Sequence, residues 1–518
     1  MSVKKLRLLN TKSARAILLA NVSALALSAC GSSSTSTDQN NTNMDGVDAG
    51  LINKLIGTND MDSLPGTTGD DVVEALGGND FVLALAGNDE IYGGDGNDTI
   101  WADDGNDVIY GGAGNDTIYP GNGDDLSYGG EGDDVIYLSS GSDKEDGGPG
   151  SDTLKIASNH SGIATTIDLL LGQYYFTAQG SSAFFNLTSI ENVDSQADAN
   201  LTIHDTPEVN IITTGSGNDV VKSVGGNDII STGSGNDRVE LATGFIYDVK
   251  LGAGNDEVVL GITYSVIDGG SGIDTLTVNE LNGITDFYAD LSTGFYFFKG
   301  VATSQDGFDT LLANFETVTV DGQVNAELIG GAGAETFNTD GGADIISAGG
   351  GNDVINVGED ADTVTGGAGN DTIDLGAADL SNDTVIFSAG GTNGSDTITS
   401  FETGFDSLNV AAAGTLVGTI EADTSAAAAK VALSAAKVLI VTDDTAADWS
   451  DVAAIMTAGI DLTGDVTGDT VIVVDNGTDS RVYLYEDNTA AADIGDAELT
   501  LLATITSTIL AEGDLTVA

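Results

Sequence analysis

The sequence predicts an all-β protein whose core is a parallel β-solenoid, and three observations lead to this fold class. Between Gly66 and Leu154 an aspartate recurs every nine residues without a slip. A glycine stands two residues before each aspartate, and Val, Ile or Leu stands two residues after nearly all of them. A short fixed period is typical of stacked repeats, in which no single turn is large enough to fold alone.

Each repeat divides into a turn and a short strand. The best copies read GGDGNDTIW (Gly93 to Trp101), GGAGNDTIY (Gly111 to Tyr119) and GGEGDDVIY (Gly129 to Tyr137). Glycine permits the positive φ of a tight turn and lets carbonyl oxygens point inward. The residues after the aspartate alternate, with one apolar side chain facing the core. Only Ser127 and Glu145 interrupt this apolar column.

These copies resemble the RTX nonapeptide GGxGxDxUx, a calcium-binding repeat. The resemblance implies a β-roll in which two nonapeptides form one coil and alternate turns lie on opposite edges. Each calcium ion then lies between successive turns on one edge, so Asp98 and Asp116, 18 residues apart, share an ion. Calcium takes six to eight oxygen ligands, and aspartate supplies a charged one. The resemblance also implies carbonyl ligands, here from Gly93, Gly96, Gly111, Gly114, Gly129, Gly132, Gly366 and Gly369.

The double glycine recurs only every 18 residues, which makes the two predicted edges unequal. One edge carries the double glycine and pairs Asp98, Asp116, Asp134 and Asp152 in succession. The opposite edge has Ala84-Leu85, Ala102-Asp103, Pro120-Gly121 and Leu138-Ser139 instead. We expect the calcium sites of this second edge, which contains Asp89, Asp107, Asp125 and Asp143, to be weaker or partly empty.

The pattern occurs in three blocks, predicted as β-rolls over residues 66–157, 209–280 and 329–400. In the third block Glu335 replaces the aspartate, and Asp360 replaces the glycine before Asp362. A single Asn-Asp-Gly run would be read as an ordinary turn, but some twenty copies in register favour calcium binding. The predicted side-chain ligands are Asp71, Asp80, Asp89, Asp98, Asp107, Asp116, Asp125, Asp134, Asp143, Asp152, Asp219, Asp228, Asp237, Asp256, Asp274, Glu335, Asp344, Asp353, Asp362 and Asp371.

The spacers between the blocks, 158–208 and 281–328, resemble each other. TIDLLLGQYYF is similar to ADLSTGFYFF, with Asp168 and Asp290 separated by 122 residues, and SIENV is similar to NFETV. Their β-branched and aromatic residues predict strands that continue the solenoid with looped-out turns. An exposed ligand platform is the alternative for their aromatic cluster, although we favour a core role for Tyr174, Tyr175, Phe295, Tyr296, Phe297 and Phe298.

The N-terminus predicts export. A basic stretch precedes the apolar run Ala16 to Ala29, which is too short to span a bilayer comfortably and suits a signal-peptide core over residues 1–29. Leu27-Ser28-Ala29-Cys30 resembles a bacterial lipobox, which implies lipidation of Cys30 and anchoring in a membrane. An ordinary secretory signal, or an uncleaved segment with a buried cysteine, is the alternative. Residues 30–65 are expected to form a flexible linker.

The segment 401–518 is predicted to be a small mixed α/β domain that caps the roll or serves secretion. Two alanine-rich stretches, 425–436 and 445–456, read as helices, and strand-like runs lie between and beyond them. VYLYEDNTAAADIGDAELTLL resembles the C-terminal region of type I secretion substrates. Because such substrates normally lack an N-terminal signal, the export route stays open.

The charge balance excludes several classes of partner. The chain carries 81 acidic and 15 basic residues, for a net charge of −66, which repels nucleic acid and anionic lipid. Because 41% of the residues are apolar, we expect the acids to gather around cations instead of belonging to a disordered chain.

No catalytic motif accompanies the repeats. The sequence has two histidines, no HExxH and no GxSxG, which disfavours the metalloproteases and lipases that also carry RTX repeats. The sequence therefore predicts a non-catalytic, calcium-binding protein, extracellular or on the bacterial outer-membrane surface, with an S-layer-like, adhesive or matrix role. The alternative is a secreted enzyme or effector whose activity lies in the C-terminal domain, with the rolls as a secretion aid.

Overall fold

A computed structural model of the chain describes residues 53–158, 164–176, 185–279, 284–299, 310–376, 381–387, 396–400 and 406–410, with separate strands between 416 and 517. The predicted signal peptide, Cys30, His160 and the first part of the predicted linker lie outside these residues.

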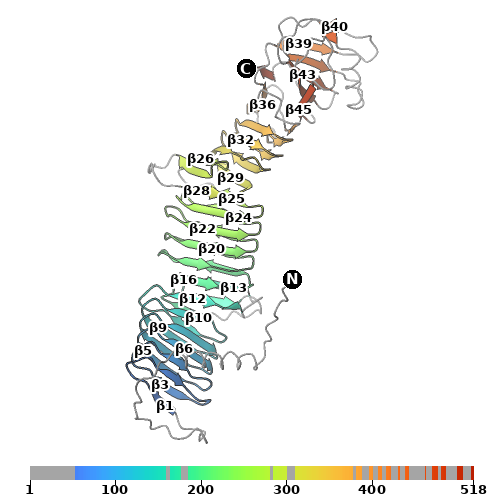
Figure 1. Cartoon of the computed structure of the whole chain (residues 1–518). Helices are drawn as coiled ribbons and strands as arrows, with labels where there is room; N and C mark the ends of the chain where they lie inside the picture. Colours follow the sequence, from blue (N-terminus) through green and yellow to red (C-terminus); the bar gives the residue numbers. More distant parts are fainter. Residues whose placement is uncertain are drawn as a thin grey trace, which may run out of the picture. The chain divides into compact units, whose positions relative to one another are not determined.

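The described chain alternates between two parallel sheets, so that each coil adds one strand to each of the two sheets (Figure 1). Val108 pairs with Leu126 in the first sheet, and Val135 pairs with Thr117 in the second. Both pairs are 18 residues apart, which confirms the coil of two nonapeptides. The first coils contain β1 (Asn53–Ile56), β3 (Asp71–Glu74), β5 (Glu90–Asp95), β7 (Val108–Ala113), β9 (Leu126–Glu131) and β11 (Lys144–Asp146) in the first sheet, and β2 (Ser63–Pro65), β4 (Phe81–Leu83), β6 (Thr99–Asp104), β8 (Thr117–Asn122), β10 (Val135–Tyr137) and β12 (Thr153–Ile156) in the second.

The solenoid begins earlier than predicted. Residues 53–65 were assigned to a flexible linker, but β1 pairs with β3 and β2 pairs with β4. The repeat extends into this segment in a weaker form, because Asp62 stands nine residues before Asp71. Its carboxylate accepts a hydrogen bond within its own turn, at 2.5 Å from the backbone nitrogen of Thr58.

Each spacer continues the solenoid as strands, as predicted, and adds one antiparallel strand to one of the sheets. In the first sheet β15 pairs parallel with β11, β14 runs antiparallel between β15 and β13, and β13 pairs parallel with β17. The second spacer repeats this arrangement in the second sheet with β28, β27, β26 and β30. The spacer strands are β13 (Thr165–Asp168), β14 (Gln173–Phe176), β15 (Phe185–Thr188), β16 (Asn192–Ser195), β26 (Asp286–Asp290), β27 (Phe295–Lys299), β28 (Leu311–Ala313) and β29 (Thr317–Gln323).

The second and third rolls repeat the pattern of the first. The second begins before the predicted boundary at residue 209 and contains β17 (Leu201–His204), β18 (Ile211–Thr213), β19 (Val220–Lys222), β20 (Ile229–Ser234), β21 (Arg238–Glu240), β22 (Asp248–Ala253), β23 (Glu257–Leu260), β24 (Val266–Ser271) and β25 (Thr275–Val278). The third contains β30 (Asn325–Ile329), β31 (Thr336–Gly341), β32 (Ile345–Gly350), β33 (Val354–Asn356), β34 (Thr363–Ala368), β35 (Thr372–Asp374), β36 (Thr384–Phe387), β37 (Asp396–Thr399) and β38 (Ser407–Val410).

The core is the stack of inward apolar side chains between the two sheets. Ile91, Ile100, Ile109 and Ile118, two residues after successive aspartates, are completely buried. The spacer aromatics follow the same strand alternation, so the predicted core role holds only in part. Tyr174 and Tyr296 are fully buried, whereas Phe295 is 40% exposed.

The outer faces of the first roll carry two ladders of stacked aromatic rings. Tyr92, Tyr110 and Tyr128 stack at 5.0 Å between ring centroids along the first sheet. Trp101 stacks on Tyr119 at 3.9 Å along the second sheet, and Tyr119 stacks on Tyr137 at 4.0 Å. The ladders follow directly from the parallel register, which places residues 18 apart on neighbouring strands.

The C-terminal strands are joined to the end of the third roll. They are β39 (Leu416–Glu421), β40 (Lys430–Val431), β41 (Val438–Thr442), β42 (Asp461–Leu462), β43 (Thr470–Asp475), β44 (Ser480–Tyr485), β45 (Leu499–Ile505) and β46 (Leu515–Val517). β45 pairs with β37, and β46 pairs with β38.

The helix predicted over 425–436 is wrong at Lys430 and Val431, because these residues pair with Asp461 and Leu462 as strands. The rest of that segment, and the helix predicted over 445–456, lie outside the described residues. In the part of the chain that the structure describes, no helix is long and apolar enough to cross a membrane.

Candidate calcium sites

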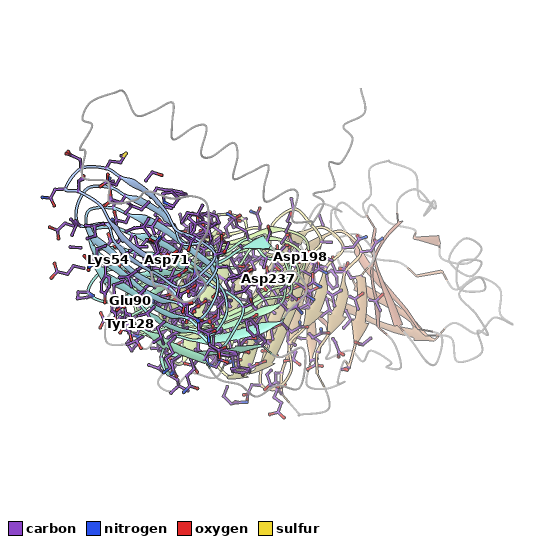
Figure 2. The ribbon with its side chains drawn as sticks, turned by 90° about the horizontal axis from the view of Figure 1, so that it is seen from below. Lys54, Asp71, Glu90, Tyr128, Asp198 and Asp237 are labelled. Atoms are coloured by element: carbon purple, nitrogen blue, oxygen red, sulfur yellow. The ribbon has the colours of Figure 1, made fainter. Side chains whose placement is uncertain are left out.

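The aspartates of the repeat form columns of buried carboxylates along the turns. The N–H of Asp98 donates to Oδ1 of Asp116 at 2.7 Å, and the N–H of Asp116 donates to Oδ1 of Asp134 at 2.7 Å. The same bond recurs in the second and third rolls, for example from Asp219 to Asp237 and from Asp353 to Asp371. Figure 2 labels Asp71 and Asp237, two of these residues, among the side chains of the stack. One oxygen of each carboxylate thus accepts a hydrogen bond from the backbone of the preceding coil and holds the two coils together.

The second carboxylate oxygen of most of these residues is buried without a hydrogen-bond partner among the described residues. A buried anionic oxygen without a partner is strongly unfavourable, and a native structure normally satisfies it with a donor, water or a cation. This group contains Asp80, Asp89, Asp98, Asp107, Asp116, Asp125, Asp134, Asp152, Asp219, Asp237, Asp256, Asp274, Glu335, Asp344, Asp353 and Asp371.

The double glycines keep free the space beside these oxygens. A Cβ at Gly93 would lie only 2.5 Å from Oδ2 of Asp98 and would also overlap the carbonyl oxygen of Gly111. Gly114 has a φ of +126°, and its Cβ would overlap the carbonyl oxygen of Gly96 in the preceding coil. The same relation holds for Gly366 with Asp371 and for Gly369 with Gly351. The turns therefore bring carboxylate and carbonyl oxygens together at positions where a side chain would not fit.

This geometry agrees with the comparison of the chain with known families. The model of the RTX calcium-binding nonapeptide repeat, which spans four copies, matches all three rolls, over residues 56–91, 83–118, 92–127, 119–154, 206–240, 329–364 and 353–379.

The chain contains RTX calcium-binding nonapeptide repeats in several copies. Its repeats imply calcium binding. No curated protein matches the chain as a relative.

The donor set of the RTX turns fits calcium. All the candidate ligands are hard oxygens, from carboxylate side chains and glycine carbonyls, which calcium prefers. Within the described residues, no three carboxylate, histidine or cysteine side chains form a metal-binding group. A cation in these turns would therefore depend on backbone carbonyls, as predicted for Gly93, Gly96, Gly111, Gly114, Gly129, Gly132, Gly366 and Gly369.

Three of the predicted ligands lie in RTX turns that satisfy their own carboxylate. Thr67 donates to Oδ2 of Asp71 through its N–H at 2.6 Å, and its hydroxyl also donates. The hydroxyl of Ser139 donates to Oδ2 of Asp143 at 2.8 Å. The hydroxyl of Ser223 donates to Oδ2 of Asp228 at 3.0 Å. A hydroxyl in the first two positions of the turn thus replaces the interaction that a cation would provide.

Sequence reasoning missed several carboxylates that continue the columns across the spacers. Glu191 accepts from the N–H of Asp152 at 2.8 Å, and Glu316 accepts from the N–H of Asp274 at 2.9 Å. The two glutamates belong to the similar segments SIENV and NFETV. The glutamate that these segments share is therefore the sequence feature that indicates the continued columns. At the end of the third roll, the columns continue through Asp383, Asp396 and Asp406.

The two edges of the first roll have the same hydrogen-bond geometry. On the edge without double glycine, the N–H of Asp89 donates to Asp107 at 2.8 Å, and Oδ2 of Asp107 has no partner in the described part of the chain. The difference lies beside the carboxylate, where Ala102 supplies a methyl group at the position that Gly111 leaves empty.

We therefore still predict weaker binding on the second edge. The substitution Asp116→Asn should weaken a high-affinity class of sites in a calcium titration, whereas Asp107→Asn should affect only a weaker class. Ala102→Gly should strengthen the second edge, because it removes the methyl group beside Asp107. Equal occupancy of both edges at every calcium concentration would contradict this prediction.

Burial raises the pKa of the column carboxyls, to about 6 for Asp107 and to about 7 for Asp116 and Asp125. The hydrogen bond from the backbone N–H lowers the pKa of each group without cancelling the effect of burial. Neighbouring carboxylates of the same column raise the pKa further. Without a cation, the folded rolls therefore keep protons on these carboxyls up to a higher pH than the unfolded chain does.

This gives a pH dependence of definite sign. The folded-state pKa exceeds the unfolded value of about 4, so protonation stabilises the calcium-free fold fully below about pH 4. That stabilisation should be lost as the pH rises through about 6 to 7. We expect the melting temperature of calcium-free protein to fall over this range, and calcium affinity to rise because calcium displaces protons. Melting curves of dialysed protein at pH 4 to 8 test this, and a calcium-free melting temperature that rises with pH would refute it.

Proposed function

We propose that this chain is a non-catalytic scaffold outside the cytoplasm whose β-rolls fold when calcium binds. The observation that carries the proposal is the repetition of buried carboxylate oxygens that have no partner among the described residues. Above the raised pKa of these carboxyls and without cations, their charges repel one another along each column. Glycine also makes the unfolded backbone unusually costly to order. Cation binding therefore contributes directly to folding.

The expected calcium affinity supports a switch between compartments. Extracellular calcium modules bind with dissociation constants of roughly 10⁻⁴ to 10⁻³ M. A chain of this kind would stay unfolded in the cytosol and fold after export. Calorimetric titration of the purified chain with calcium should reveal many ions per chain and a large heat of coupled folding. A chain that binds no calcium at millimolar concentration would overturn the proposal.

The N-terminal sequence supports a location at the cell surface. The apolar run before Cys30 and the lipobox-like Leu27-Ser28-Ala29-Cys30 favour export and lipid anchoring. We propose an S-layer-like, adhesive or matrix role there. Incorporation of radiolabelled palmitate into the native chain, and its loss in Cys30→Ala, would establish the anchor. Labelling that persists in the variant would exclude Cys30 as the attachment point.

The pairing of the C-terminal strands supports a capping role for residues 401–518. β45 and β46 each extend one sheet of the third roll, so they cover strand edges that would otherwise be open. Expression of residues 411–518 alone distinguishes a cap from the enzyme or effector that we considered as the alternative. A cap should remain unfolded without the roll, whereas an autonomous fold with a deep polar pocket would favour the alternative.

A further inference from the structure

Two polar residues interrupt the apolar column of the first roll, and the structure brings them together. Ser127 in β9 lies directly opposite Glu145 in β11, between Ile109 on one neighbouring strand and Leu187 on the other. Both side chains are only 1% exposed. They therefore lie inside the solenoid, in the column of side chains that Ile91 and Ile109 occupy in the preceding coils.

Two buried oxygens of this pair lack a partner within the part of the chain that the structure describes. Neither Oγ of Ser127 nor Oε2 of Glu145 has a hydrogen-bond partner among the described residues. The hydroxyl of Tyr174 lies 3.5 Å from Oε1 of Glu145, a long contact that leaves Oε2 unaffected. Asp125, two residues before Ser127, contributes a third unpartnered oxygen, Oδ2. Three oxygen atoms, two on adjacent strands and one in the turn before β9, thus lack a partner in the described part of the chain.

The internal duplication shows that the architecture does not require this polarity. With the offset of 122 residues that relates the two spacers, Ser127 corresponds to Val249, Glu145 to Ile267 and Tyr174 to Tyr296. Val249 pairs with Ile267 just as Ser127 pairs with Glu145. In that copy the hydroxyl of Tyr296 instead accepts from the N–H of Ser265 at 3.0 Å. The same fold is thus built once with an apolar pair and once with a serine and a carboxylate.

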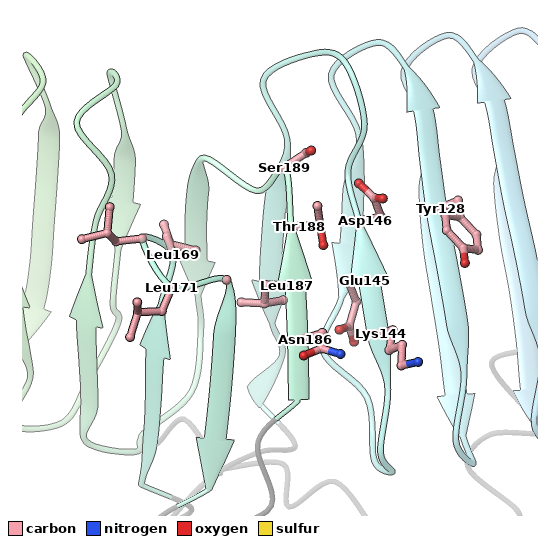
Figure 3. Close-up of a pocket in the computed structure, with 12 residues that line it drawn as sticks. Tyr128, Lys144, Glu145, Asp146, Leu169, Leu171, Asn186, Leu187, Thr188 and Ser189 are labelled. Atoms are coloured by element: carbon pink, nitrogen blue, oxygen red, sulfur yellow. The ribbon is translucent and has the colours of Figure 1, made fainter.

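A carboxylate at this depth requires compensation. Oε2 of Glu145 is a buried acceptor that no described residue satisfies, which is unfavourable unless a cation, a water or a proton compensates it. Lys144 and Asp146 flank Glu145 on β11, next to Leu187 of β15 (Figure 3). A hollow of about 550 Å³, lined by these three β11 residues and the turn after β13, borders the same strand. Glu145 is one of the residues that line this hollow.

We propose that Ser127 and Glu145 hold a cation inside the first roll, beside Asp125 and separate from the ions of the turns. The ligands are a carboxylate and a hydroxyl, both hard oxygens, so the site takes a hard cation, with calcium as the probe. Since the described residues provide no group of three carboxylate, histidine or cysteine ligands, the hydroxyl of Ser127 and bound water complete the set. The site does not depend on the double glycines.

Crystals of the full chain grown in calcium, and others soaked in terbium, test the proposal directly. An anomalous difference peak is expected between Oγ of Ser127 and Oε2 of Glu145, in addition to peaks in the turns. The turn peaks serve as an internal reference. If they are present and the interior peak is absent, this inference fails while calcium binding by the turns stands.

Two variants test the site in solution. Ser127→Val with Glu145→Ile reproduces the pair found in the second copy, and Glu145→Gln removes only the charge. The double variant should bind one ion fewer per chain, and its calcium-free melting temperature should rise by at least about 2 °C because two buried polar groups without partners are replaced by apolar side chains. The melting temperature gained on adding calcium should shrink in both variants.

A buried water at this position would give a different result. In that case Glu145→Gln would leave the calcium stoichiometry and the calcium-induced shift unchanged, and the inference would be overturned. Ile109→Val, which alters the neighbouring apolar layer without introducing or removing an oxygen, serves as the matched control. It should leave the number of bound ions unchanged.

Discussion

Exhaustive removal of calcium should abolish the β-sheet circular dichroism of the rolls and their cooperative melting at neutral pH. At a calcium concentration ten to a hundred times the dissociation constant, each site adds roughly 1.4 to 2.7 kcal/mol to stability. A whole domain is stable by only roughly 5 to 15 kcal/mol. Because many carboxylate oxygens of the columns have no partner among the described residues, the stability lost with all the ions should exceed this margin.

The measurement is circular dichroism and melting before chelation, after chelation, and after calcium is restored. Magnesium at equal concentration is the control, because its strict octahedral geometry and slow dehydration suit these carbonyl-rich turns poorly. Recovery with calcium but not with magnesium would establish the specificity. An unchanged spectrum and melting point after chelation would refute calcium-dependent folding altogether.

Gly114→Ala should destabilise the first roll by about 3 kcal/mol. Gly114 has a φ of +126°, which an alanine adopts only with strain, and the new Cβ would overlap the carbonyl of Gly96. Both effects act in the middle of the stack, so neighbouring coils cannot move apart without breaking the carboxylate hydrogen bonds. Urea denaturation in saturating calcium measures the change.

Gly69→Ala is the matched control, because Gly69 occupies the same repeat position in the first matched turn. No atom lies within 4 Å of the Cβ that this substitution adds. We expect a change within about 0.5 kcal/mol, or slight stabilisation through the unfolded chain. Equal losses in the two variants would show that the close contact at Gly114 does not limit stability.

The resemblance to the RTX nonapeptide implied the coil of two repeats, and the observed register joins residues 18 apart on neighbouring strands, as that coil requires. The nine-residue period itself predicted stacked turns with one carboxylate each. It could not predict that Thr67 satisfies Asp71, because that contact depends on the conformation of one turn. The period alone treats every aspartate as equivalent, whereas local hydroxyl groups decide which of them retain an unpartnered oxygen.

The irregular segments were harder to predict. The similarity of the two spacers was visible, yet the placement of Glu191 and Glu316 in the carboxylate columns needed the three-dimensional register. Strands before Gly66 were missed because β1 and β2 lack the glycine-rich signature, although Asp62 continues the spacing. At Lys430 and Val431, strand pairing prevailed over the helix propensity of the surrounding alanines.

The ring of Trp101, stacked on Tyr119 in the aromatic ladder, gives the first roll an optical signal of its own. Indole emission depends on contact with neighbouring groups and with water, so separation of these two coils should change the intensity and wavelength of tryptophan fluorescence. The chain has one other tryptophan, Trp449, and replacing it with phenylalanine would assign the emission to Trp101. The assembly of coils could then be followed in real time after rapid mixing with calcium, without an attached dye.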